Sequence, residues 1–475
     1  MNTRTEHDLL AAREVPAEAY YGIHALRAGE NFPLLGQPLH GELISALALV
    51  KAACARANMR CGRLETRKGE AIVRAAEEVA GGALCEQFIV DALQGGAGTS
   101  ANMNMNEVLA NRALEILGEA RGRYDLLDPL DDVNLQQSTN DVFPTAVRVA
   151  ALRLLLPVIE DFANLQAALQ EKEGEYAAML ALGRTEMQDA VPITVGQRFA
   201  AWAQAVQRDW WRLHVVEEKL RQVNLGGTAI GTGLNAERKY IYAVVDNLRQ
   251  STGLNLARAE NSIDLTQNAD VFVEVSGLLK TAAATLAKIA GDLRLLSSGP
   301  CGGIHEIDLP ELQAGSSIMP GKVNPVIPEA LTQVAYQVMA NDLAITLAAQ
   351  AGQLELNAFL PLIAHNLLES LDLLHRGVFI FITRCITGLQ VNAERSMHWL
   401  EQSYALATAV APYLGYHLAG EVAREAAQRG VTMRTALLER QLFTAEELAQ
   451  ITAAYELTTP GVAGEKKLGR LKSEE

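Results

Sequence analysis

The chain has 475 residues, of which 49% are hydrophobic and 20% charged, and its formal net charge is −15. This composition indicates a folded, soluble protein, and the acidic balance excludes nucleic acid as an expected partner because phosphate binding requires a basic surface. Aromatic residues make up only 5% of the chain, which favours helices over sheets.

Neither the start of the chain nor any apolar run predicts a membrane protein. The first residues are polar and acidic, unlike a signal peptide, and the uncharged run 404–420 is shorter than the ~20 residues of a membrane span. The five cysteines are odd in number and lack metal-binding spacing. We therefore expect reduced, mostly buried thiols, no bound zinc and a cytoplasmic location.

Residues 1–40 are interrupted by glycine and proline, which predicts irregular structure there. Beyond them, apolar residues recur every three or four positions, the spacing of buried helix faces. The predicted helices cover 42–61, 67–81, a long segment from near Thr145, 194–223, a segment through 279–293 that stops at Ser297–Pro300, and 330–389 with breaks around Gly352 and Pro361.

The length and apolar character of these segments predict a mostly α-helical protein with a central bundle of long helices. The last of them is apolar on more than one face, which suggests that its helices also meet partner subunits. We expect three domains: an N-terminal helical domain over 1–139, the central helix bundle over 140–392 and a small C-terminal domain over 393–475.

Four polar islands separate the predicted helices, at residues 94–107, 134–141, 183–192 and 226–235. They are rich in glycine, hydroxyl and amide side chains, which donate and accept hydrogen bonds. The first is compatible with a flexible turn as well as with an anion cradle. The second can cap the following helix as well as bind a ligand.

The segment Gly315–Pro325 places two hydroxyls and a lysine between glycines and prolines. The glycines permit unusual backbone angles, and the prolines fix φ, so the segment reads as a shaped loop. Asn324 and Pro325 are suited to begin the apolar helix that follows, and a helix start beside Lys322 attracts anions. An ordinary turn before a helix is the alternative.

None of the histidines lies inside an island, which argues against a Ser-His-Asp relay. The reactive group must then be sought among Ser316, Ser317, Thr99, Thr139 and Lys322. The residues alone lead to a helical enzyme for a small carboxylate, and they do not define its reaction.

The segment Gly315–Asn324 resembles the GSSxMPxKxN signature of the fumarase/aspartase superfamily and matches it completely. The segments 98–104, 137–141 and 183–185 resemble the other substrate loops of that superfamily, in the same order. The opening segments 4–6 and 19–24 resemble the aspartate ammonia-lyase branch more than the fumarases, and the similarity extends over essentially the whole chain.

The resemblance implies a three-domain fumarase/aspartase-like fold in which the long helices form the core of a tetramer. It implies elimination of ammonia from L-aspartate to give fumarate, reversibly, through an aci-carboxylate intermediate. Ser316 would be the base that removes the Cβ proton, with Lys322 helping to stabilise its alkoxide. Each site would be shared between subunits. The mechanism requires no organic cofactor, and no metal ligand is assigned in the site.

Further roles follow from the same resemblance. The β-carboxylate would be held by the hydroxyls of Thr99, Ser138, Thr139 and Ser317. The α-carboxylate would be held by Thr185, Lys322 and Asn324. Asn140 would contact the leaving amino group.

The chain departs from the superfamily at Glu186, where many members have histidine and some aspartases glutamine. A carboxylate there can pair with the substrate ammonium and discriminate against malate, or it can point to a structural partner. A fumarate hydratase acting on malate and fumarate is the alternative function, and a non-catalytic structural protein is a more distant one.

Overall fold

The computed structural model of the protein describes residues 2–315 and 317–468, and the described part is mostly helical. This confirms the predicted mostly α fold with long helices. The long helices are α2 (Gly41–Arg60), α5 (Thr139–Glu175), α6 (Val195–Leu220), α9 (Asp270–Leu296), α10 (Val326–Gln350) and α11 (Leu360–Phe381).

The remaining elements are shorter. The other helices are α1 (Ile23–Asn31), α3 (Thr66–Ala80), α4 (Thr99–Ile116), α7 (Arg238–Thr252), α8 (Ser262–Gln267), α12 (Ala393–Gln402), α13 (Leu406–Leu414), α14 (Tyr416–Arg429), α15 (Met433–Glu439), α16 (Ala445–Ile451), α17 (Ala454–Thr458) and α18 (Glu465–Leu468). The strands are β1 (Thr3–His7), β2 (Ala12–Pro16), β3 (Leu180–Thr185), β4 (Gln188–Thr194), β5 (Gln222–Val223), β6 (Ala257–Arg258), β7 (Ile307–Asp308) and β8 (Gln390–Val391), paired β1–β2, β3–β4, β5–β6 and β7–β8.

The chain folds into two compact units, each built from three separate stretches. Unit 1 contains Met1–Glu160, Asp209–Ala284 and Val334–Arg376, and unit 2 contains Asp161–Arg208, Thr285–Gln333 and Gly377–Glu475. Each of α5, α6, α9, α10 and α11 contributes residues to both units. The division into three domains at 139 and 392 stays a prediction.

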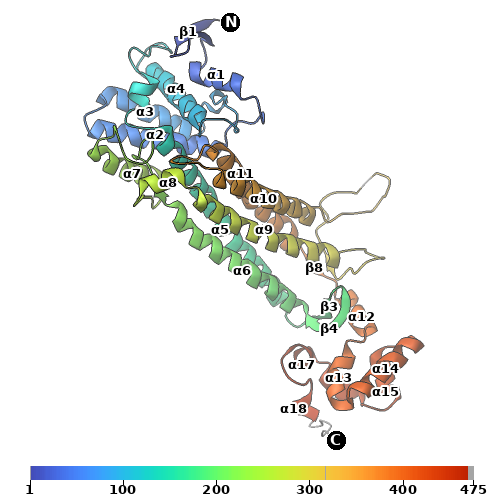
Figure 1. Ribbon diagram of the computed structural model, residues 1–475. Helices are drawn as coiled ribbons and strands as arrows, with labels where there is room; N and C mark the ends of the chain where they lie inside the picture. The colour runs from blue at the N-terminus through green and yellow to red at the C-terminus, as the bar shows by residue number, and fades with distance from the viewer. Residues whose placement is uncertain (1, 316, 469–475) are drawn as a thin grey trace. The chain divides into compact units, whose positions relative to one another are not determined.

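Within unit 1 the parts of α5, α6, α9, α10 and α11 that belong to it run side by side (Figure 1). On α5, the buried Arg148 donates to the carbonyl of Lys219 on α6, and its guanidinium lies 5.0 Å from the ring centroid of Phe272 on α9. An ion pair of 2.5 Å joins Lys280 of α9 to Asp342 of α10. Buried leucine, valine and alanine side chains fill the space between the helices, as the apolar spacing predicts.

Helix α5 is the one described helix that is long and apolar enough to cross a membrane. However, 72% of its most apolar window is buried inside the protein. Its apolar residues therefore serve as core, as in the central helix of a soluble bundle.

The apolar periodicity located most helices well. The predictions for 42–61 and 67–81 differ from α2 and α3 by about one residue at each end, and α9 ends just before Ser297, as predicted. The predicted break near Gly352 and Pro361 separates α10 from α11, and Pro361 lies in the first turn of α11.

The prediction of irregular structure over 1–40 was wrong, because β1, β2 and α1 lie there. Strands β1 and β2 form a hairpin held mainly by polar contacts. Arg4 donates to the carbonyls of Ala19 (2.7 Å) and Tyr21 (2.8 Å), so one guanidinium fixes the chain after the hairpin. Apolar periodicity could not reveal a hairpin of this kind.

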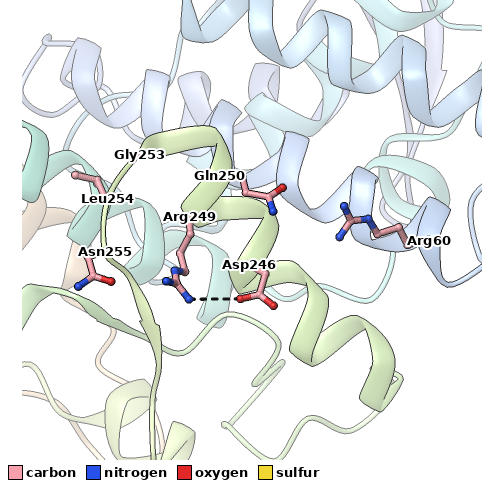
Figure 2. A pocket seen from close by; sticks show the side chains of 7 residues that line it. All are labelled: Arg60, Asp246, Arg249, Gln250, Gly253, Leu254 and Asn255. Carbon is pink, nitrogen blue, oxygen red and sulfur yellow. Dashed lines mark ion pairs between the residues drawn. The ribbon is translucent and has the colours of Figure 1, made fainter.

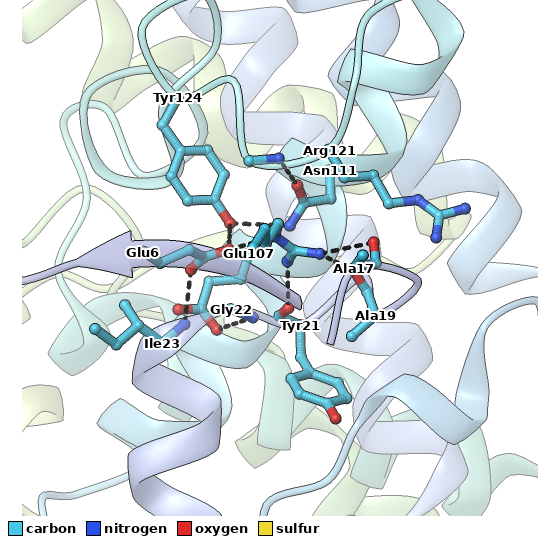
Figure 3. A network of polar contacts seen from close by, with 12 residues as sticks. Glu6, Ala17, Ala19, Tyr21, Gly22, Ile23, Glu107, Asn111, Arg121 and Tyr124 are labelled. Atoms are coloured by element: carbon cyan, nitrogen blue, oxygen red, sulfur yellow. Dashed lines mark hydrogen bonds and ion pairs between the residues drawn. The ribbon is translucent and has the colours of Figure 1, made fainter. Parts of the chain in front are cut away.

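Two buried carboxylates accept hydrogen bonds from backbone N–H groups at the start of α1 (Figure 3). Glu6 accepts from the N–H of Ile23, and Glu107 of α4 accepts from the N–H groups of Gly22, His24 and Ala25. Burial raises the pKa of Glu107 to about 8, although the three N–H donors act in the opposite direction. These contacts satisfy N–H groups that a helix start leaves unpaired.

The start of α5 was also predicted wrongly, since the helix begins at Thr139 and not near Thr145. Ser138 caps it by accepting from the N–H of Asn140 (3.2 Å), while Asp141 accepts from the N–H of Ser138 (2.9 Å). Pro144 lies inside the first turns, and the helix continues through it.

The segment after Ser403 has a hydrophobic core of its own, formed by residues of α13 to α16 such as Val410, Val422, Leu437 and Ile451. All five cysteines are free thiols. Only Cys54 and Cys385 are buried, so the expectation of mostly buried thiols was wrong.

Candidate active site

In unit 1, a glycine turn sets the start of α4 and with it Thr99. Gly98 has φ +94°, and a Cβ at this position would lie 2.5 Å from the Phe143 ring, so a side chain is excluded. Thr99 follows as the first residue of α4 and is exposed. The close packing of Gly98 on α5 therefore holds Thr99 beside the start of that helix.

The start of α4 is linked to the start of α5 through a buried amide. Asn102 donates to the hydroxyl of Thr139 (3.1 Å) and to the side-chain oxygen of Asn134 (3.3 Å). Three predicted site residues, Thr99, Ser138 and Thr139, are thus brought together by contacts inside unit 1. Ser138 caps α5, which is one of the two roles considered for its island, and its role in binding a ligand stays a prediction.

Asn140 joins α5 to the fourth polar island. Its amide donates to the carbonyl of Ala229 (2.7 Å), and its own carbonyl accepts from Asn224 (3.0 Å). Pro144, four residues later in the helix, has no N–H to offer this carbonyl. The Asn224 side chain therefore replaces a missing helix hydrogen bond and ties residues 226–235 to the candidate site.

Asp141 is completely buried beneath the same loops. Its carboxylate accepts from the backbone N–H groups of Ser138 (2.9 Å), Gly226 (3.0 Å) and Thr228 (3.1 Å). Burial raises the pKa of this carboxyl to about 6, against the lowering effect of the N–H donors and of Lys51.

Lys51, a residue of α2, lies fully buried under the second island. Its ammonium donates to the side-chain oxygens of Asn134 and Gln137, both at 2.8 Å. Burial lowers its pKa to about 7, because desolvation disfavours the charged form. A lone lysine in the apolar run of residues 43–57 was the sequence signal that pointed to this group, and the sequence reasoning missed it.

In unit 2, Thr185 and Glu186 lie at the tip of the hairpin β3–β4. Glu186 (φ +52°) and Met187 (φ +65°) form a two-residue turn with both residues in the left-handed region, which β-hairpins favour but non-glycine residues rarely adopt. Glu186 is exposed, and in the described part of the chain it forms no hydrogen bond or ion pair.

The signature loop is also in unit 2 and is closed at its base. The N–H of Gly315 donates to the carbonyl of Lys322 (2.8 Å), and Ala314 pairs with Val323. A Cβ on Gly315 would lie 2.2 Å from that carbonyl oxygen, which explains the glycine. Ser316 lies outside the described residues.

Ser317 and Lys322 line an open pocket of about 540 Å³, whose other lining residues are 311–315, 319–321 and 323, and both are exposed. Asn324 is partly buried and precedes α10, which begins at Val326. The first helical hydrogen bond of α10 runs from the N–H of Glu329 to the carbonyl of Pro325. Pro325, and not Asn324, therefore occupies the N-cap position of α10. Among the predicted site residues, Thr185, Glu186, Ser317, Lys322 and Asn324 belong to unit 2, and the others described belong to unit 1.

A second open pocket, in unit 1, is polar but includes none of the predicted site residues (Figure 2). Arg60 and Arg249 line it, at the ends of α2 and α7, and Arg249 pairs with Asp246. Arginines at helix C-termini offset the negative end of the helix dipole. This pocket therefore has a sufficient structural explanation.

No group of three or more His, Cys, Asp or Glu that could hold a metal ion occurs within residues 2–315 and 317–468. The loops offer hydroxyls, amides, backbone N–H groups and cations, which are the donors that a polyanionic carboxylate needs. The long helices and these loops suit a helical enzyme that binds a small carboxylate.

Comparisons with known proteins agree. A family model described as "Lyase" matches residues 11–340, and another described as "Fumarase C C-terminus" matches residues 406–459. The aspartate ammonia-lyase of Bacillus subtilis is 47% identical over 465 residues, covering 98% of both chains. The chain belongs to the fumarase/aspartase superfamily, and within it to the aspartate ammonia-lyase family.

Two solved structures support the fold. The structure of a Brucella melitensis protein described as "fumarate lyase:delta crystallin" and bound to cobalt has a TM-score of 0.93 and 48% identity, covering 97% of this chain and 100% of that one. The class II fumarase of Schistosoma mansoni has a TM-score of 0.90 and 33% identity, with the same coverage. The predicted fumarase/aspartase-like fold is thereby confirmed.

Replacing Lys51 by methionine tests the buried cation. The side-chain oxygen of Gln137 would lose its lysine donor, and that of Asn134 would keep only the amide of Asn102, so we expect kcat/KM for the lyase reaction to fall about 10- to 100-fold. Lys172→Met is the matched control, since Lys172 is also buried but pairs with Glu175 in α5. An equal fall of kcat/KM in both variants, or no fall in Lys51→Met, would contradict a role of Lys51 in supporting the candidate site.

Proposed function

We propose that this chain is an aspartate ammonia-lyase that reversibly eliminates ammonia from L-aspartate to give fumarate. The observation that carries the proposal is the 47% identity, over 98% of both chains, with a protein named aspartate ammonia-lyase. The complete signature loop and the polar loops of both units add to it, since a purely structural protein does not need them.

The chemistry requires a base, because the Cβ proton beside a carboxylate is weakly acidic. In the proposed mechanism, Ser316 takes this proton, and the electron pair moves into the β-carboxylate to form the aci-carboxylate. The pair then forms the double bond while the C–N bond breaks and ammonia leaves. Backbone N–H groups of the loop and Lys322 would stabilise the serine alkoxide.

The aci-carboxylate carries an additional negative charge that preorganised donors must meet. We assign this role to Thr99, Ser138, Thr139 and Ser317. The hydrogen-bonded link from Asn102 to Thr139 supports the assignment for unit 1, because a hydroxyl that already accepts a hydrogen bond is free to donate its own proton.

The other end of the substrate is assigned to Thr185, Lys322 and Asn324, which would hold the α-carboxylate. Asn140 would contact the amino group. The Nδ2 group of Asn140 donates a hydrogen bond to the Ala229 carbonyl. The amide oxygen therefore points away from Ala229 and can accept a hydrogen bond from an ammonium. The proposed mechanism uses no organic cofactor and no metal ion.

Glu186 is proposed to pair with the substrate ammonium and so to favour aspartate over malate. Its exposed position at the hairpin tip supports this reading over a structural one, since no partner in the described residues holds it. The left-handed turn beneath it fits a functional position, because strained backbone is retained where it serves a site.

A homotetramer with sites shared between subunits is the proposed assembly. Residues Tyr336, Leu343 and Leu347 of α10 are 63%, 61% and 51% exposed and follow one another at heptad-like spacing. A row of large apolar side chains on a long helix matches the seam of a helix bundle. A second copy of the chain is the proposed partner, and the free cysteines are compatible with a proposed location in the cytoplasm.

Product identification tests the reaction. Purified protein is incubated with fumarate plus ammonia and, separately, with fumarate alone, and the products are identified by NMR. We expect aspartate from the first mixture and an about 100- to 10,000-fold lower rate in Ser316→Ala, the effect of losing a positioned base. Malate from the second mixture would select a fumarate hydratase, and full activity of Ser316→Ala would reject the base.

Replacing Glu186 by glutamine tests the specificity role. The amide keeps the size of the side chain but not its charge, so we expect KM for aspartate to rise about three- to tenfold. Met187→Gln, a neutral change at the neighbouring turn residue, is the control. An unchanged KM in Glu186→Gln would count against the pairing.

A charge on the α10 row tests the assembly. Leu343→Asp would place carboxylates in the apolar seam, and we expect the tetramer to dissociate in sedimentation velocity experiments. Leu354→Asp is the control, because Leu354 is 82% exposed but lies beyond the end of α10. If Leu343→Asp sediments like the unchanged protein, α10 is not the interface.

A further inference from the structure

One fully buried carboxylate of unit 2, that of Glu306, lies between two arginines. Its two oxygens accept from Arg184 (2.7 Å) and from Arg198 (3.0 Å). The arginine side chains are only 17% and 14% exposed. Charge-assisted bonds in such a poorly solvated setting are strong and geometrically restrictive.

The two arginines come from different elements. Arg184 belongs to β3, directly before Thr185, and Arg198 lies in the first turn of α6. Both also donate to the carbonyl of Leu182, at 3.4 and 3.2 Å. The carboxylate therefore fixes the root of the hairpin β3–β4 to the start of α6.

The backbone of Glu306 is fixed as firmly as its side chain. Its N–H donates to the carbonyl of Leu296, at the end of α9, and its carbonyl accepts from the N–H of Asn392, each at 2.9 Å. Strand β7, which follows directly, pairs with β8. Glu306 is thus held through both its backbone and its side chain, and the hairpin is attached to it through Arg184.

The hairpin needs such an attachment because its own structure is weak. A two-stranded hairpin is marginally stable alone, and this one has an irregular register between Leu182 and Arg184. A Cβ on Gly183 would lie 2.5 Å from the carbonyl oxygen of Val191, so the bulge excludes other residues there. The turn at Glu186 and Met187 adds strained backbone at the tip.

We propose that Glu306 is a positioning residue for substrate binding, acting through Arg184 on the adjacent Thr185. The proposal rests on the proposed function, which assigns Thr185 to the α-carboxylate of aspartate. Glu306 does not touch the substrate. It sets the direction in which the hairpin presents its tip, and a loosened tip weakens substrate binding more than the chemical step.

The test is the split between KM and kcat in Glu306→Gln. The glutamine amide keeps the shape, but it can accept from only one arginine. We expect KM for aspartate to rise about tenfold, equivalent to one lost charge-assisted hydrogen bond, with kcat changing less than about threefold. The inhibition constant of succinate, a dicarboxylate that does not react, is expected to rise in parallel.

Asp342→Asn is the matched control. Asp342 is also a buried carboxylate paired with a cation of another helix, but it belongs to unit 1 and does not contact the hairpin. We expect both variants to lower the melting temperature, and only Glu306→Gln to raise KM. Arg198→Lys, which keeps the charge but not the two-point contact, serves as a second variant and is expected to raise KM in the same way.

The outcomes separate this proposal from the proposed function. An unchanged KM in Glu306→Gln, an equal rise in Asp342→Asn, or a fall in kcat alone would overturn it. Failure of both Glu306→Gln and Arg198→Lys to fold would also overturn it, since Glu306 would then be purely structural. Absence of aspartate turnover by the unchanged protein would instead reject the proposed function.

Discussion

The candidate site of unit 1 depends on the buried carboxylate of Asp141. Three backbone N–H groups from two distant loops converge on it, one at the start of α5 and two in the glycine loop near residue 227. A carboxylate in this position costs desolvation energy, and only multiple donors can offset that cost. Any rearrangement of one loop therefore leaves a buried charge without its partners, and this couples the two loops.

The same logic explains the buried amides around this site. Pro144 deprives the Asn140 carbonyl of its usual donor, and the Asn224 side chain supplies one. Lys51 supplies a donor to Asn134 and Gln137 from beneath. Polar side chains here satisfy hydrogen-bonding groups that backbone hydrogen bonds of a regular helix would satisfy elsewhere. They also fix irregular backbone close to the hydroxyls of Ser138 and Thr139.

How much the sequence could predict depends on which forces hold each element. Helices α2, α3 and α9 bury apolar faces, and periodicity located α2 and α3 within about one residue at each end and also located the end of α9. The hairpin β1–β2 is held by Arg4, and α5 begins before a proline, so rules based on apolar spacing and helix breakers failed there. The candidate site residues were predicted from the polar islands and from motif resemblance. Lys51, Asn224 and Glu306 lie outside those motifs, and Asn102 lies inside one, but the contacts of all four become visible only in the structure.

The distribution of charge shows why these buried groups matter for an anionic substrate. The chain has a net charge of −15, which repels a dicarboxylate at long range. At physiological ionic strength this repulsion is screened beyond about 8 Å, so binding is decided by charges close to the site. Each unit has such charges beneath its loops: Lys51 in unit 1, and in unit 2 two arginines for the single carboxylate of Glu306. Because two arginines share the single carboxylate of Glu306, an excess of positive charge lies at the root of the hairpin whose tip is proposed to bind the substrate, and this is how an acidic protein can retain a local affinity for acids.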